Sequence, residues 1–178
     1  SSRAGDLASR FIRLFPLEAL ATQFAGFLSR DSRALTPDER AHALEVFAGA
    51  LDLDAVRVVR TSIANAPTTL GNIIRVAHDR ELDPVTLIHE LAHVWQYQTQ
   101  GTAYISDSAW HQVSAVLATG SRRAAYDLTE EDLNAESIHH LPAEKQAVII
   151  ECWFANAALR EDPDYARFLA EVRNSAKS

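Results

Sequence analysis

The chain has 178 residues, with 17 Lys and Arg against 24 Asp and Glu, so its formal net charge is −7 at pH 7. This length predicts one globular domain, residues 1–178, that buries roughly 70% of its unfolded surface and therefore needs no structural metal or disulfide to fold. The acidic charge and the lack of a Lys- and Arg-rich stretch argue against a nucleic-acid partner, and the single Cys152 excludes an internal disulfide.

Residues 6–30 carry apolar side chains at helical spacing, interrupted near Pro16. We expect one broken helix or two short ones here. The apolar stripe favours packing in the core, and the alternative is a surface on residues 1–30 that docks on a partner protein or a membrane. No window of about 18 apolar residues is free of charge, so no membrane-spanning helix is expected.

Two short segments have the composition of strands. Valines alternating with arginines mark residues 56–61, and residues 73–77 form a second β-rich run. We interpret residues 65–72 as the loop between these strands, with Gly71 and Asn72 in a turn that enters the second one.

The remaining segments carry start or stop signals of helices. An N-cap residue followed by proline opens three of them, at Thr36-Pro37, Asp83-Pro84 and Asp162-Pro163. Gly101 ends the second, because glycine readily adopts the conformation that follows a helix. The expected helices are residues 37–48, 84–100, 107–119, 142–159 and 163–173, with one capped turn at 129–133. With the strands, these elements predict a helix-rich α+β fold with a small sheet.

Residues 89–93, His-Glu-Leu-Ala-His, lie inside the helix expected over 84–100. Positions four apart lie one turn above each other on a helix, so His89 and His93 can present imidazole nitrogens to one metal ion. Glu90 can reach a metal-activated water, take its proton during attack on a carbonyl and return it to the leaving amine. In the absence of a metal, the histidines would be hydrogen-bonded residues on a polar helix face.

A hydrolytic zinc site has three protein ligands and one open position. Glu144 and Glu151 are candidates for the third ligand, because both lie on the apolar helix expected over 142–159, where an unpaired carboxylate is costly to bury. They are about two turns apart, so only one of them can bind the metal directly. His139 and His140, just before this helix, are the remaining alternatives.

These motifs resemble those of the gluzincin metallopeptidases. The His-Glu-Leu-Ala-His motif at 89–93 is followed by a helical glutamate, as in that group, and Glu-Lys-Gln-Ala at 144–147 looks like the Glu-x-x-Ala element of its CAAX-processing type. The resemblance implies zinc as the cofactor, with Glu144 as the third ligand and Glu90 as the general base. The element usually continues with Asp, where this chain has Val148.

A closer resemblance, over about residues 36–154, is to metallopeptidase-like domains associated with bacterial Rhs and contractile-injection-system proteins. It rests on His-Glu-Leu-Ala-His-Val-Trp-Gln-Tyr-Gln at 89–98, with Thr-Leu-Gly-Asn at 69–72 upstream and Glu-Lys-Gln-Ala at 144–147 downstream. At the positions of residues 144–147 those domains tend to have Glu-Gln-Gln-Ala, so Lys145 of this chain replaces the first Gln. The resemblance implies a zincin fold, and a location in the bacterial cytoplasm or as a secreted or injected effector.

Several residues near the motif have less specific signals. The tetrahedral intermediate of peptide hydrolysis needs a further donor. The candidates are Tyr104, His111, Tyr126, His139 and His140. The strand at 73–77 could pair with an extended substrate peptide, as in zincins generally. We expect Trp95 and Tyr97 to pack, and Gln96 and Gln98 to face solvent or cap a neighbouring loop.

The sequence therefore predicts a single-domain zinc metallopeptidase that hydrolyses peptide bonds and has a peptide or protein substrate. One alternative is a catalytically silent zincin-fold scaffold or cargo module of a bacterial secretion or injection apparatus. Another is a latent protease, completed by a partner that docks on residues 1–30.

Overall fold

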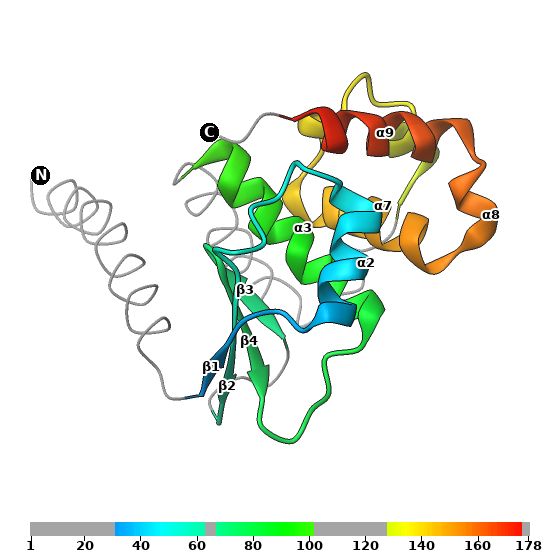
Figure 1. Ribbon diagram of the computed structural model, residues 1–178. Coiled ribbons are helices and arrows are strands. Elements are labelled where there is room, and N and C mark those ends of the chain that lie inside the picture. Colours follow the sequence, from blue (N-terminus) through cyan, green and yellow to red (C-terminus); the bar gives the residue numbers. More distant parts are fainter. Residues whose placement is uncertain (1–30, 63–66, 102–127, 176–178) are drawn as a thin grey trace, which may run out of the picture.

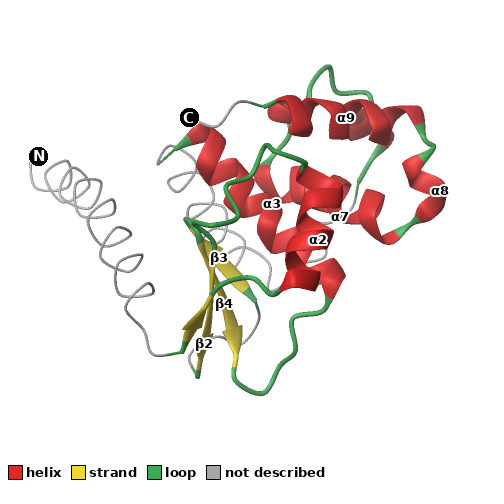
Figure 2. Cartoon of the chain, viewed as in Figure 1, coloured by secondary structure: helices red, strands yellow, loops and turns green. Residues whose placement is uncertain are grey.

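The structure is a computed structural model that describes residues 31–62, 67–101 and 128–175. Within these ranges the chain is a helix-rich α+β fold in which a four-stranded sheet lies beside a group of helices, as Figures 1 and 2 show. The strands are β1 (Ser32–Arg33), β2 (Arg57–Thr61), β3 (Thr68–Leu70) and β4 (Ile73–Ala77). The helices are α2 (Pro37–Phe47), α3 (Pro84–Gln100), α6 (Glu130–Leu133), the 3₁₀ helix η1 (Ile138–His140), α7 (Ala143–Ala155), α8 (Ala157–Arg160) and α9 (Pro163–Asn174).

The predicted fold class is confirmed by this architecture. The capped helices at Thr36-Pro37 and Asp162-Pro163 and the capped turn near Thr129 are confirmed as α2, α9 and α6. Three predictions, the helical segment over 6–30, the docking surface on residues 1–30 and the helix over 107–119, lie outside the described residues. No helix in the described ranges is long and apolar enough to cross a membrane.

The sheet has the strand order β1-β2-β4-β3, in which β2 and β4 are parallel and the other two pairs are antiparallel. β3 and β4 form a hairpin with Gly71 and Asn72 as its loop. Gly71 has a φ of 60°, which the first loop position of a type II′ turn requires and which glycine adopts without steric cost. The predicted turn is confirmed, but the loop assigned to 65–72 is wrong because Thr68–Leu70 is a strand.

The position of β4 corrects a second prediction. β4 pairs with β2 along one side and with β3 along the other, so the sheet itself uses its backbone groups. Residues 73–77 are therefore not the strand on which a substrate peptide could pair. Among the described residues β3 pairs with β4 alone, which makes β3 one of the two outer strands, with β1 at the other edge.

One face of the sheet packs against the helices and fixes α3. Val58, Ile74 and Val76 are fully buried, in one apolar cluster with Phe47 of α2 and Leu91 of α3. The same cluster includes the buried residues Ala147, Ile149, Ile150 and Trp153 of α7 and Tyr165, Phe168, Leu169 and Val172 of α9. Each large apolar side chain buried in this way stabilises the fold by about 1.5–3 kcal/mol, so α3 and α7 are held firmly side by side.

The ends of α3 and α7 follow from local residues. The Asp83 carboxylate accepts hydrogen bonds from the first backbone amides of α3, and Gly101 ends the helix with a φ of 66°, so the predicted bounds are confirmed. α7 begins after Pro142 as predicted. Its predicted extent to residue 159 is wrong, because the chain leaves the helix at Asn156, whose side chain caps α8.

Candidate metal centre

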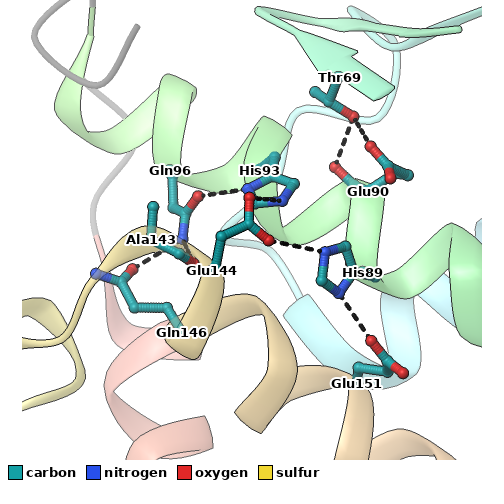
Figure 3. Close-up of polar contacts among 9 residues, drawn as sticks. All are labelled: Thr69, His89, Glu90, His93, Gln96, Ala143, Glu144, Gln146 and Glu151. Atoms are coloured by element: carbon teal, nitrogen blue, oxygen red, sulfur yellow. Dashed lines mark hydrogen bonds and ion pairs between the residues drawn. The ribbon is translucent and has the colours of Figure 1, made fainter. Parts of the chain in front are cut away.

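α3 and α7 bring together two histidines and a glutamate (Figure 3). His89 Nε2 lies 3.4 Å from Glu144 Oε2, and His93 Nε2 lies 3.5 Å from Glu144 Oε1. The candidate ligand atoms of these three residues all lie within 4.8 Å of one another. His89 and His93 are only 8% and 4% exposed, which shields the group from water. The four-residue spacing on α3 thus places both imidazoles on the side that α7 covers.

The separations suit a shared metal ion better than direct hydrogen bonds. Charge-assisted hydrogen bonds are about 2.7–2.9 Å long, shorter than either distance. Ligand atoms about 2.0–2.1 Å from a tetrahedral metal lie about 3.3–3.4 Å from one another. Glu144 Oε2 is also buried and accepts no hydrogen bond within the described residues. A carboxylate oxygen in that position is costly unless a cation compensates it, so the group could hold a metal ion.

The other nitrogen of each imidazole has a partner that fixes the ring. His89 Nδ1 lies 2.7 Å from Glu151 Oε2, and His93 Nδ1 lies 2.9 Å from Gln96 Oε1. Both partner atoms are acceptors, so a neutral ring carries its proton on Nδ1 and its lone pair on Nε2. Metal-binding histidines are usually oriented in this way. Glu144 and Glu151 therefore contact opposite nitrogens of His89.

The charges of the group favour a bound cation. Burial acts to lower the pKa of His89, but the nearby carboxylates of Glu144 and Glu151 and the charge of Glu90 outweigh it and raise the pKa to about 10. Burial acts to raise the pKa of Glu144, but the proximity of the His89 and His93 imidazoles and their charge hold that pKa well below its usual range. The cluster thus attracts positive charge strongly, whether as a proton or as a metal ion.

Glu90 follows His89 in the chain but points to a different neighbour (Figure 3). Its carboxylate is buried, and Oε2 accepts a 2.6 Å hydrogen bond from the hydroxyl of Thr69 on β3. The same hydroxyl lies 3.2 Å from the Glu90 carbonyl oxygen. Glu90 is therefore held beside the group of candidate ligands without belonging to it. Sequence reasoning missed Thr69, whose only signal was its place in Thr-Leu-Gly-Asn.

Gln96 and Gln98, two glutamines of α3, differ in how well their predicted positions agree with the structure. Gln96 is fully buried, so the prediction that it faces solvent is wrong. The sequence feature that could have indicated this burial is the spacing of three residues between His93 and Gln96, which puts both side chains on one helix face. Gln98 caps a neighbouring loop as predicted, since its side chain exchanges hydrogen bonds with the backbone of Asp52. It also donates to the Asn72 side chain in the hairpin loop.

The remaining candidates lie away from this group. His139 is exposed in η1, and its ring packs on Trp95 with 5.5 Å between centroids. His140 is exposed beside it. Within the described residues, neither joins the group of possible ligands. The candidate donors Tyr104, His111 and Tyr126 lie outside the described residues.

Comparison with known proteins adds a likeness of fold. No protein-family model and no curated protein matches the chain. Among solved structures, the effector domain of Pseudomonas aeruginosa VgrG2b resembles it with a TM-score of 0.57 and 22% sequence identity. The match covers 88% of this chain and 95% of that domain, so the likeness extends over nearly the whole of both chains. At this identity it shows a shared fold.

Proposed function

We propose that the chain is a zinc-dependent peptidase of the gluzincin type, with zinc bound by His89, His93 and Glu144. One observation carries the proposal: both Nε2 atoms lie 3.4–3.5 Å from Glu144 oxygens while both Nδ1 atoms bond elsewhere. Two imidazoles and one carboxylate are a donor set typical of catalytic zinc, with one position left open. Bound zinc would supply Lewis acidity, which polarises a substrate carbonyl and makes water more acidic.

Glu90 is the general base and acid in this proposal. Its carboxylate would take a proton from the attacking water and deliver it to the leaving amine as the peptide C–N bond breaks. The hydrogen bond from Thr69 supports this role because it restricts the orientation of a carboxylate that is not itself a ligand.

We further infer that an extended substrate pairs with β3. β3 is one of the two outer strands of the described sheet, and its Thr69 contacts Glu90, so a peptide on this strand would lie close to the general base. Peptides methylated on alternate backbone nitrogens should then bind more weakly than their parents. Equal binding of the methylated peptides and their unmethylated parents would contradict pairing of the substrate backbone with β3.

The likeness to an effector domain supports a biological setting for the activity. We propose that the chain is an effector module that a bacterium secretes or injects, and that its substrate is a peptide or protein. The competing proposal is a module with the same fold but no activity, which acts as scaffold or cargo. The following experiment distinguishes this module from a peptidase.

The experiment combines metal analysis with digestion of a mixed peptide library by the purified chain. We expect stoichiometric zinc and peptide cleavage. Glu90→Gln should keep zinc near the wild-type level and lose hydrolysis by at least about 10²–10⁴-fold, the contribution of a positioned general base. Glu81→Gln, at an exposed carboxylate before α3, is the matched control.

Each other result has a definite meaning. Zinc without cleavage in the wild type favours the scaffold. Loss of zinc in the Glu90 variant contradicts its assignment as a non-ligand, and retained cleavage excludes it as the base. Absence of zinc from the wild type refutes the metal site itself.

A further inference from the structure

A chain of two buried side-chain amides begins at His93 and ends at the start of α7 (Figure 3). Gln96 Oε1 lies 2.9 Å from His93 Nδ1, and Gln96 Nε2 donates to Gln146 Oε1 at 3.1 Å. Gln96 Nε2 also donates to the Ala143 carbonyl at 2.8 Å. Gln146 Nε2 donates in turn to the Leu141 carbonyl at 2.8 Å. Gln96 and Gln146 are 0% and 3% exposed, so protein partners must satisfy these polar atoms.

The direction of this chain is fixed by its end points. A backbone carbonyl only accepts hydrogen bonds, so the Leu141 carbonyl requires the NH₂ group of Gln146, and the oxygen of Gln146 must face Gln96. The Ala143 carbonyl likewise requires the NH₂ group of Gln96. The oxygen of Gln96 is therefore the atom that faces His93. The reverse orientation of either amide would set oxygen against oxygen.

The fixed direction determines the tautomer of His93. Gln96 Oε1 lies within hydrogen-bond distance of Nδ1, at 2.9 Å, whereas the acceptor facing Nε2, Glu144 Oε1, is 3.5 Å away. A neutral ring is therefore favoured with its proton on Nδ1 and its lone pair on Nε2, directed toward Glu144. The amide chain ends at Ala143, the residue before Glu144, so it also links the imidazole to the helix start that carries the carboxylate.

We propose that Gln96 and Gln146 are positioning residues, which select the Nδ1-protonated tautomer of His93 and align its Nε2 atom with Glu144 for metal binding. The proposal rests on the metal-binding part of the proposed function. It assigns a purpose to two buried amides that the hydrolytic chemistry itself does not use.

The first test reads the tautomer directly. Long-range ¹H–¹⁵N correlation spectra of wild-type protein, without metal and loaded with zinc, should show the His93 proton on Nδ1. A proton on Nε2 of the metal-free neutral ring would overturn the proposal. This measurement needs no variant, and it gives an answer even if the protein binds no zinc and the proposed function fails.

The second test measures zinc affinity by competition with a chelator. Gln96→Leu should lose roughly 10–100-fold in affinity, as is typical when the partner of a ligating histidine is removed, and should show mixed His93 tautomers. Gln96→Glu keeps an oxygen facing Nδ1 and should therefore keep the Nδ1 tautomer, while its buried charge and the lost donor to the Ala143 carbonyl should lower the stability of the fold. Gln98→Leu, on the same helix but bonded to Asp52 and Asn72, is the control. A Gln96→Leu variant that loses no more affinity than this control would refute the role.

Discussion

Replacing each glutamate of α7 by alanine separates a direct ligand from a residue that supports one. Glu144 faces Nε2 of both histidines, whereas Glu151 bonds to Nδ1 of His89. Seven residues of helix separate the two glutamates, roughly 10 Å along the axis, so both cannot bind one metal directly. We therefore expect Glu144→Ala to lose far more zinc affinity than Glu151→Ala.

The contacts set the expected size of each loss. Glu151→Ala removes only the partner of His89 Nδ1, and such changes typically weaken metal binding by about 10–100-fold, or about 1.4–2.7 kcal/mol. Glu144→Ala removes one of the three proposed ligands together with both oxygens that face the imidazoles. Its loss should therefore exceed roughly 100-fold, the upper end of the range for a supporting residue.

The assay is competition with a chelator of known zinc affinity, at equal pH for all variants. Circular dichroism of the metal-free proteins checks that each variant folds, and Glu131→Ala, at an exposed carboxylate in α6, is the control. If Glu151→Ala loses the metal while Glu144→Ala keeps it, the assignment is reversed. If both keep it, the third ligand lies elsewhere in the chain.

Two further substitutions test Glu90 and the start of α2. Thr69→Val should reduce peptide hydrolysis about 10-fold without loss of zinc, because Glu90 loses its 2.6 Å hydrogen bond, whereas Thr69→Ser should retain the rate. Equal rates for the two variants would exclude a positioning role. Burial acts to raise the pKa of Glu39, but its hydrogen bonds and the charge of Arg33 outweigh burial and lower that pKa. The ionised carboxylate therefore stabilises the fold at pH values above the pKa that Glu39 has in the unfolded chain, and this stabilisation is lost as the pH falls through the lowered pKa of the folded state. Glu39→Gln should therefore lower the free energy of unfolding by about 1 kcal/mol at neutral pH, and its Tm in thermal melts should fall less steeply than that of the wild type on acidification. Asp38→Asn, at an exposed position, is the control and should retain the wild-type dependence of Tm on pH.

The helix bounds that could be predicted depend on neighbouring residues. Asp83 caps α3, proline follows it, and Gly101 ends the helix, so the whole signal lies within the sequence of the helix and its flanks. The end of α7 was missed because its apolar pattern continues past Asn156. That residue accepts a hydrogen bond from the Ala158 amide, which begins a new helix instead of extending the old one.

The features that could not be predicted depend on pairing and packing between separate elements. β3 has three residues, too few for a periodic pattern, and it forms because it pairs with β4. The burial of Gln96 depends on Gln146 and on the Ala143 carbonyl, which only the packing of α3 on α7 brings within reach. The His-Glu-Leu-Ala-His motif, in contrast, carries its spacing within a single helix.

The two imidazoles are oriented by different chemistry, which affects the charge of the site. His89 is oriented by the carboxylate of Glu151, whereas His93 is oriented by the neutral amide of Gln96. The carboxylates of Glu144 and Glu151 already match the two charges of a divalent cation, before the carboxylate of Glu90, the proposed general base, is counted. A further carboxylate at position 96 would be fully buried and uncompensated, which is costly. The amide provides the same acceptor without that charge, because its donors are satisfied by the start of α7.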